Sequence, residues 1–168
     1  MPQGRSQFVG LCGTYYVAFC LTREGLHASM TIGNAPNIDI LVSSVDGKRL
    51  LSLQVKTATW AYHKKRYGRE LWEFRLSPSA GQLRSDSLWY AFVDLQGPTG
   101  PPQVFLVPSH WVAHFADKEW ETWRLKLYWV FKEVEPQCKE CWDKVKSFLD
   151  GDDEILRWGH DVPPEAKR

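Results

Sequence analysis

Apolar and polar residues alternate along the stretch from Asn37 to Thr57, and a short polar turn divides it into two halves. The alternating apolar positions are Ile38, Ile40 and Val42 in the first half and Leu51, Leu53 and Val55 in the second. A period of two is typical of a strand with one face in a core. The turn contains Asp46-Gly47, a pair that readily adopts the positive φ of a tight hairpin turn. The pattern therefore predicts a β-hairpin over residues 37–57.

Similar patterns predict further elements on both sides of this hairpin. A helix is expected from about Ser6 to Glu24, because apolar residues recur there at helical spacing. Its predicted core-facing residues are Phe8, Leu11, Cys12, Tyr15, Ala18, Phe19 and Thr22. Strands are expected over 26–32, 71–76, 88–95, 103–107 and 124–132, a short helix or loop over 81–87, and helices opening at 108 and 136. A helix from Asp117 competes with the last strand. The elements together predict an α/β fold with a mixed sheet of five or six strands.

Three residues of the hairpin carry candidate chemistry. Gln54 and Lys56 share one face of the second strand, and the hairpin can bring Asp39 beside them. One carboxylate, one amide oxygen and one ammonium suit a hydrated divalent metal and a phosphate. Mg²⁺ takes one or two oxygen ligands from protein and keeps positions for water and substrate phosphate. We therefore expect Asp39 and Gln54 to hold Mg²⁺ or Mn²⁺, and Lys56 to orient the attacking water or stabilise charge on the phosphate.

The order of these residues, Asp39 and then Gln54-Val55-Lys56 on the far arm of a hairpin, resembles the active-site signature of the PD-(D/E)XK nuclease superfamily. The likeness is to its small Holliday-junction-resolvase-like branch, in which a glutamine can replace the second acid. It covers residues 8 to 112, including a tyrosine-bearing helix before the hairpin and the aromatic strands SLWYAFVDL and QVFLVPSHW after it. The resemblance implies a restriction-endonuclease-like fold and a Mg²⁺-dependent endodeoxyribonuclease. It also leaves a homodimer open, because nucleases of this superfamily frequently act as dimers.

Two departures from the signature leave other functions open. Members of the branch often carry a metal-binding glutamate on the first helix, whereas the corresponding position here is near Thr14 and the acid of this helix is Glu24, at its end. In addition, Gln54 is neutral. The alternative is therefore a nuclease-fold protein that binds nucleic acid or a protein partner without cleavage. A third interpretation is an interaction protein with an aromatic interface, since aromatic residues are enriched at interface centres.

The segment WAYHKKRYGRE, which follows the hairpin, is the most basic part of the chain. Lys64, Lys65, Arg66 and Arg69 are interleaved there with aromatic residues. Because the segment leaves the strand that carries Lys56, it can reach a polyanion lying across the site. Its cations would contact phosphates and its rings would stack on unpaired bases. The alternative is an ordinary solvated loop.

The four cysteines do not form a recognisable metal site. Cys138 and Cys141 have the Cys-x-x-Cys spacing, but no second pair of ligands is visible in the sequence, and a closed zinc site needs four. Both lie on the apolar stripe of the last predicted helix, so we expect them in the core. Cys12 and Cys20 are also expected to be small buried residues.

Composition, length and charge limit the number of domains and the classes of partner. The length of 168 residues suits one domain, which we expect over 1–149, followed by an acidic and loose tail over 150–168. The net charge is only +1, so contact with nucleic acid depends on local clusters of charge. No apolar run is long enough to span a membrane and the first residues lack a signal-peptide core. These features predict a cytoplasmic protein with no membrane partner and with reduced cysteines.

Overall fold

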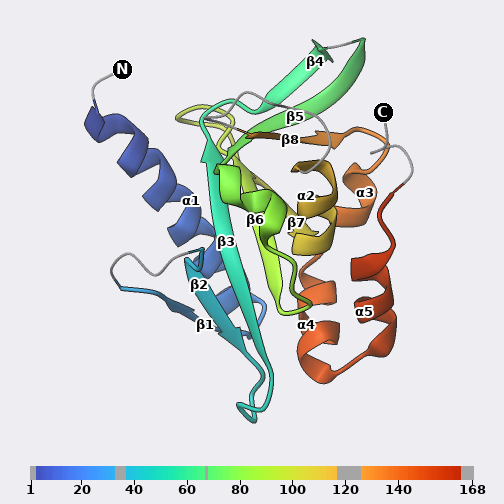
Figure 1. Ribbon diagram of the computed structural model, residues 1–168. Coiled ribbons are helices and arrows are strands. Elements are labelled where there is room, and N and C mark those ends of the chain that lie inside the picture. Colours follow the sequence, from blue (N-terminus) through green and yellow to red (C-terminus); the bar gives the residue numbers. More distant parts are fainter. Residues whose placement is uncertain (1–2, 33–36, 67, 117–125, 164–168) are drawn as a thin grey trace.

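The computed structural model describes residues 3–32, 37–66, 68–116 and 126–163. Helices cover a central mixed sheet, and a second, smaller sheet lies across one end of it (Figure 1). The helices are α1 (Gln3–Arg23), α2 (Ser109–Ala116), α3 (Glu135–Cys138), α4 (Trp142–Asp150) and α5 (Asp153–His160), with one 3₁₀ helix, η1 (Pro78–Gln82). The strands are β1 (His27–Met30), β2 (Ile40–Ser43), β3 (Leu50–Ala58), β4 (Tyr62–Arg66), β5 (Arg69–Leu76), β6 (Leu88–Asp94), β7 (Gln103–Pro108) and β8 (Lys126–Phe131). The predicted α/β class is therefore confirmed.

The central sheet has five strands in the order β1-β2-β3-β6-β7. Its neighbouring strands are antiparallel, except that β3 and β6 run parallel. The predicted hairpin is present as β2 and β3, with Ile40 opposite Leu53. Between the parallel strands, the chain leaves the central sheet and forms β4, β5 and η1. The strands β4 and β5 join β8 in a separate three-stranded antiparallel sheet.

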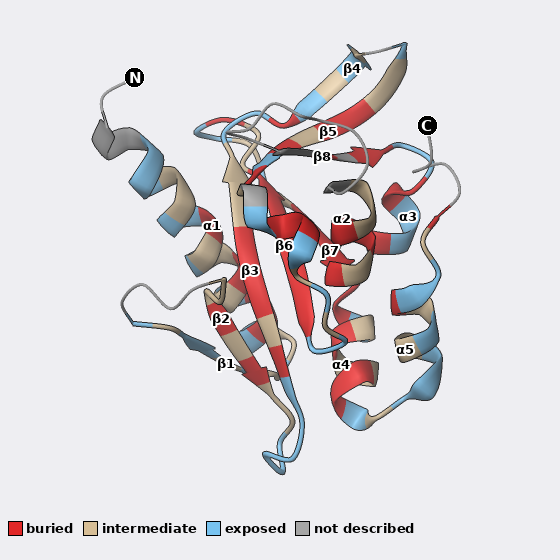
Figure 2. Ribbon diagram, in the orientation of Figure 1, coloured by how far each residue is buried: buried red, intermediate tan, exposed pale blue. Residues whose placement is uncertain are grey.

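Buried residues are concentrated in the strands of the central sheet and in the helices against it (Figure 2). They form two hydrophobic cores, because side chains alternate across the sheet. On β6, Trp89 and Ala91 belong to the core shared with α1 and α4, whereas Tyr90 and Phe92 belong to the core shared with α2 and the smaller sheet. The rings of Phe92 and Tyr128 stack with centroids 4.7 Å apart and join the two sheets. None of the described helices is long and apolar enough to cross a membrane.

Helix α1 is present, but the sequence predicted the wrong face toward the core. The predicted stripe is largely exposed: 68% of Phe8, 57% of Tyr15 and 57% of Phe19 are accessible to solvent, and Leu11, Cys12 and Thr22 are also exposed. The residues that contact the sheet are instead Gly13, Val17, Cys20 and Leu21. A glycine lets the helix approach β3 closely at this point, and counting bulky residues alone favours the opposite face. The burial predicted for Cys12 is therefore wrong, whereas that of Cys20 is confirmed.

The chain after β8 also differs from the expected single helix. Cys138 and Cys141 are buried as predicted, and burial raises the pKa of the Cys141 thiol to about 12. The helix is divided into α3 and α4, however, because the intervening backbone bonds to β7 at the edge of the sheet. The Glu140 N–H donates to the Val104 carbonyl at 2.8 Å, and Lys139 forms a bridge with Phe105. These bonds occupy polar groups that an edge strand would otherwise leave open.

The acidic segment from residue 150, which the sequence predicts to be a loose tail, contains the packed helix α5. Asp152 caps this helix, because its carboxylate accepts the Glu154 N–H at 2.9 Å. The Trp158 ring then contacts Trp89 and Trp111, with centroids 5.4 and 4.9 Å away. The acidic segment thus includes a helix at residues 153–160 that packs on the body of the protein. The competing helix from Asp117 falls largely outside the described residues, and β8 begins at Lys126 as part of the expected strand.

Candidate active site

The β2–β3 hairpin holds the carboxylate of Asp39 against the strand that carries the other two predicted residues. Asp39 directly precedes β2, and its N–H donates to the Leu53 carbonyl at 2.9 Å. Its side chain turns toward β3, where Oδ2 accepts the Val55 N–H at 2.7 Å. A backbone donor fixes the carboxylate in this position. Asp39 therefore lies beside the residue that separates Gln54 from Lys56 in the sequence.

Gln54 lies on the face of β3 opposite to Leu53 and Val55, which point into the core. Only 6% of its surface is exposed. The Nε2 amide donates to Asn37 Oδ1 at 3.5 Å, and Asn37 itself adopts a φ of 65°, a conformation that asparagine tolerates better than most residues. The Oε1 oxygen of Gln54 has no hydrogen-bond partner among the described residues. A buried oxygen without a donor is costly, so it is a candidate ligand for a cation.

Lys56 follows on the same face of β3 and is partly buried. Burial lowers the pKa of its ammonium group, and the negative charge of Asp39 opposes that shift. The lysine is thus close enough to Asp39 to interact electrostatically. The structure brings the three predicted residues together on one hairpin.

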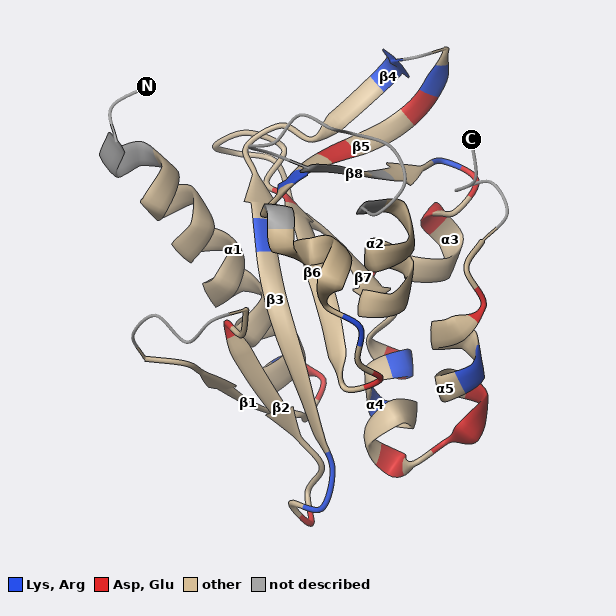
Figure 3. Cartoon of the chain, viewed as in Figure 1, with Lys and Arg blue, Asp and Glu red and all other residues tan. Residues whose placement is uncertain are grey.

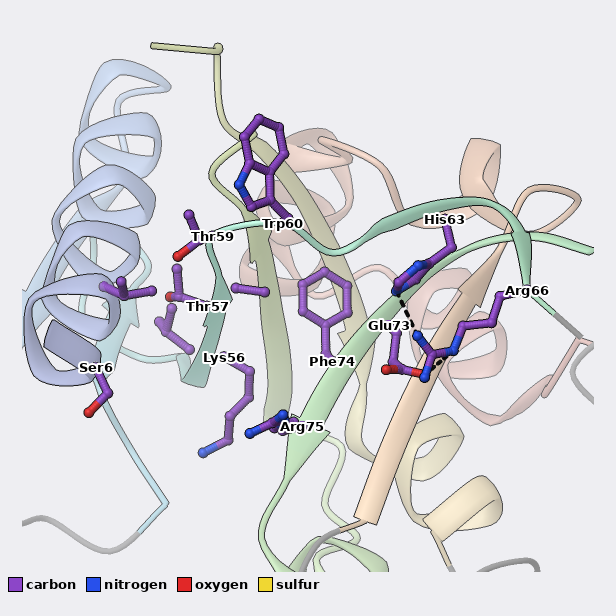
Figure 4. A pocket seen from close by; sticks show the side chains of 13 residues that line it. Ser6, Lys56, Thr57, Thr59, Trp60, His63, Arg66, Glu73, Phe74 and Arg75 are labelled. Atoms are coloured by element: carbon purple, nitrogen blue, oxygen red, sulfur yellow. Dashed lines mark hydrogen bonds and ion pairs between the residues drawn. The ribbon is translucent and has the colours of Figure 1, made fainter. Parts of the chain in front are cut away.

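Lys56 lines a pocket of about 760 Å³ at the end of β3, between α1 and β5 (Figure 4). The polar and aromatic residues of its wall are Ser6, Lys56, Thr57, Thr59, Trp60, His63, Arg66, Glu73, Phe74 and Arg75. In Figure 4 the side chains of Lys56 and Arg75 extend toward the same side of the pocket. Trp60 stands at its rim and is 69% exposed. The pocket therefore offers cations and one accessible ring next to the hairpin.

The basic segment forms the β4–β5 hairpin of the smaller sheet rather than a loop, and this hairpin projects from the body (Figure 3). Lys64 and Lys65 are exposed on it, as a role in binding would require. The two arginines are engaged within the protein. Arg66 Nε lies 3.1 Å from a Glu73 carboxylate oxygen, and an Arg69 nitrogen lies 3.1 Å from Glu133. The basic segment is thus a strand pair in which both arginines are ion-paired, Arg66 within the pair and Arg69 to Glu133 outside it.

The first helix provides no acid to the pocket among the described residues. Its contribution to the wall consists of Ser6 and Val9. Thr14, at the position where the resemblance places a glutamate, donates its hydroxyl to the Gly10 carbonyl of its own helix at 3.2 Å. Glu24 is instead paired with Lys146 at 2.9 Å. Among the described residues, α1 therefore lacks the metal-binding glutamate that the resemblance implies.

Sequence reasoning missed two residues of the pocket wall. Arg75 lies on the strand expected over 71–76, where it is exposed at the pocket and has no ion-pair partner among the described residues. Trp60 begins the basic segment WAYHKKRYGRE, and its ring packs against Gly97, where an added Cβ atom would come within 2.4 Å of the indole. The alternation of apolar and polar residues along β5 indicates that Arg75 points away from the core. The contact between Trp60 and Gly97 depends on packing that a sequence does not reveal.

A second group of polar residues lies outside this pocket. Ligand atoms of Asp86, His110 and His160 all lie within 4.8 Å of one another, so these residues could hold a metal ion. They come from three separate parts of the chain and have no spacing that a motif would reveal. The local sequence therefore carries no signal for this cluster.

No family model matches this chain, and neither the curated proteins nor the solved structures contain a significant match to it. The interpretation of the pocket therefore depends on its own geometry and chemistry.

Proposed function

We propose that this protein is a metal-dependent nuclease that hydrolyses phosphodiester bonds in DNA, with Asp39, Gln54 and Lys56 as its catalytic group. One observation carries the proposal: the Asp39 carboxylate is bound at 2.7 Å to the Val55 N–H, between the two other residues of the group. Of the three, Lys56, whose pKa is lowered by burial, lines the pocket together with further cations, whereas Asp39 and Gln54 lie on the same hairpin outside the pocket wall. That combination suits a substrate with a phosphate at its reacting centre.

The residues fit a hard divalent cation. Asp39 supplies a charged oxygen, and the buried Oε1 atom of Gln54 lacks a donor among the described residues. Mg²⁺ or Mn²⁺ accepts such a small set of protein oxygens, because water and substrate phosphate complete its shell. When bound, the ion would acidify a water molecule and offset charge on the phosphate. Asp39 and Gln54 are the residues that would hold it.

Lys56 supplies the remaining chemistry from the chain itself. Its ammonium group can donate hydrogen bonds to the attacking water and to a phosphate oxygen that gains charge. Partial burial strengthens these interactions, because the local dielectric constant is lower than that of water. The lowered pKa also makes the proton of Lys56 easier to release than that of an exposed lysine.

The pocket wall supports the binding of a nucleic-acid chain. Arg75 extends toward the same side as Lys56 and can pair with a neighbouring phosphate. Lys64 and Lys65 are exposed on the projecting hairpin and can contact the backbone further along. Trp60 presents an accessible ring for stacking on an unpaired base.

The alternative function is binding without cleavage, and one specific observation favours it. Among the described wall residues of the pocket, the acid is Glu73, and Arg66 already neutralises it at 3.1 Å. A metal at the hairpin would therefore meet one carboxylate without an ion-pair partner among the described residues, that of Asp39. Such a site binds an ion weakly unless the substrate phosphate completes the shell.

The two functions are separated by an assay on supercoiled, linear, single-stranded and branched DNA, and on RNA of matched sequence. Each substrate is incubated with Mg²⁺, Mn²⁺ or EDTA. Cleavage that requires the metal supports the nuclease and identifies its substrate. Substrates that are shifted on a gel but remain intact under every metal condition would support the binding protein instead.

Replacing Trp60 with alanine is expected to weaken binding to single-stranded DNA by about 1–3 kcal/mol, or roughly 5- to 150-fold in Kd, because one base loses its stacking partner. Fluorescence anisotropy at several salt concentrations measures the change. The slope of log Kd against log salt should stay constant in this variant, because no phosphate contact is lost. Arg75→Ala should reduce that slope by about one phosphate contact. Phe19→Ala, which removes another exposed ring that lies outside the pocket, serves as the control; equal losses for Trp60 and Phe19 would exclude stacking at the pocket.

A further inference from the structure

Three residues that are far apart in the sequence meet on the side of the molecule formed by α2 and α5. Asp86 lies in the turn before β6, His110 is the second residue of α2, and His160 is the last residue of α5. The Nε2 atoms of both histidines lie 2.9 Å from the same oxygen, Asp86 Oδ1. Their rings are 4.1 Å apart between centroids. This cluster is independent of the nuclease pocket and shares no residue with it.

The backbone holds the first two residues in a fixed relation. The Ser109 hydroxyl donates to the Ser85 carbonyl at 2.8 Å and accepts the Ser85 N–H at 2.9 Å. Ser109 is completely buried, so this pair of bonds joins the turn to the start of α2 away from water. The Trp89 indole N–H also donates to the Asp86 carbonyl at 3.3 Å. Asp86 and His110 are each adjacent to one of these anchored positions.

Packing of α5 brings the third residue to the same place. Trp158 is wedged between Trp89 and Trp111 and is covered on one side by the ammonium group of Lys144, 3.8 Å from its ring. Gly159 is buried at the contact with Pro108, whose side-chain atoms would lie 3.8 Å from an added Cβ. His160 follows directly, with a side chain about half exposed. All three side chains are thus positioned before any ligand arrives, which lowers the cost of binding.

The spacing and the atom types match the coordination shell of a borderline transition metal. When Zn²⁺ binds an imidazole nitrogen and a carboxylate oxygen, the two ligand atoms lie about 2.9–3.4 Å apart. The lower value corresponds to an octahedral angle at the metal and the upper value to a tetrahedral one. Both nitrogen-to-oxygen distances fall at the lower end of this range. Two imidazoles and one carboxylate favour Zn²⁺, whereas Mg²⁺ prefers oxygen ligands alone. The partial exposure of all three side chains leaves a fourth position open to water.

We propose that Asp86, His110 and His160 form a Zn²⁺ site that fastens α5 to the body of the protein. Helix α5 needs such a link more than the other helices do. Its apolar residues Ile155, Leu156 and Trp158 are only partly buried, and among its described residues only Gly159 is fully so. Binding to the folded state alone raises stability in proportion to the logarithm of the ion concentration over Kd. The site therefore links the end of the described chain to the turn before β6.

The full chain, stripped with EDTA and dialysed, tests this proposal by calorimetric titration with Zn²⁺ alone and by thermal unfolding with and without the ion. The wild type should bind one equivalent and unfold at a higher temperature when it is present. His160→Ala and Asp86→Asn should each weaken binding at least about tenfold, the loss found even for groups that lie behind metal ligands. They should also abolish the thermal shift.

The control is His27→Ala, because His27 is an exposed histidine on β1 whose described contact is a 3.4 Å hydrogen bond to Ser43. It should bind Zn²⁺ as the wild type does. Co²⁺ in place of Zn²⁺ gives a second readout, since its visible absorption reports nitrogen and oxygen ligands directly. The proposal is overturned if the wild type binds no stoichiometric Zn²⁺, or if His160→Ala and Asp86→Asn bind it as tightly as His27→Ala.

Discussion

Replacing Lys56 with alanine is expected to lower the rate of DNA cleavage by about 10²–10³-fold, the usual loss when one preorganised donor to a transition state is removed. The lysine is partly buried beside Asp39, so its charge acts in a medium that screens it less than water does. Affinity for DNA should fall far less than the rate, because other cations of the pocket remain. Single-turnover rates with saturating enzyme separate the two effects.

The matched control is Lys48→Ala, on the same β2–β3 hairpin but in its turn. Lys48 is exposed and pairs with Asp46 at 3.0 Å, away from the pocket. Its removal takes the same charge from the protein and should leave the rate unchanged. If both variants cleave at the wild-type rate, Lys56 has no catalytic role. If both lose activity equally, the effect is one of net charge and not of position.

Replacing Gly13 with alanine is expected to destabilise the protein by about 1–3 kcal/mol, the range for an overpacked contact. A Cβ atom at this position would lie 1.9 Å from Thr57 Oγ1 and 2.9 Å from Thr57 Cγ2. Helix α1 would have to move away from β3, next to Lys56. Urea unfolding measures the stability, and the cleavage rate of the folded variant reports whether the pocket moves as well.

The same helix offers a control of opposite sign. A Cβ atom at Gly10 would meet nothing within 4 Å, so Gly10→Ala should stabilise the helix by up to about 1 kcal/mol through its propensity alone. Combining Gly13→Ala with Thr57→Ala removes the two atoms in closest conflict and should recover part of the lost stability. Equal effects of alanine at Gly10 and Gly13 would contradict the close packing of α1 on β3.

The hairpin could be predicted from the sequence because its information is local. Period-two alternation and an Asp-Gly turn determine both strands, and the register then puts Asp39 near Gln54 without reference to the rest of the fold. The strands at residues 88–94 and 103–108 could also be predicted locally, because each is a continuous apolar run. The hairpin carries the proposed catalytic group, and residues 88–94 form the strand beside it.

The face of α1 could not be predicted in this way, because its contact with the sheet depends on a small residue. Phe8, Tyr15 and Phe19 form the more apolar stripe, yet they remain outside while Gly13 approaches Thr57. The distribution of apolar residues around a helix indicates which face is more hydrophobic. It does not indicate which face fits a neighbouring strand. Close approach at a glycine is a property of two surfaces together.

Contacts between distant segments were equally hidden. The ion pair of Arg69 with Glu133 joins β5 to the turn after β8, and it makes that arginine less available to a substrate than its sequence context indicates. Asp86 and His110 are held together by the hydrogen bonds between Ser85 and Ser109, and the packing of Trp158 brings His160 to them. Local sequence contains neither relation, because both depend on how β5, β8 and α5 return to the body.

Asp39→Asn tests the central claim most directly. The amide oxygen of asparagine can still accept the Val55 N–H that Asp39 binds at 2.7 Å, so the hairpin is preserved while the charge is lost. Cleavage by wild type and variant is followed in Mg²⁺ and Mn²⁺, with unfolding curves to verify equal stability. The account predicts metal-dependent cleavage by the wild type and a rate for Asp39→Asn near that measured in EDTA. Undiminished cleavage by a folded Asp39→Asn variant would contradict it.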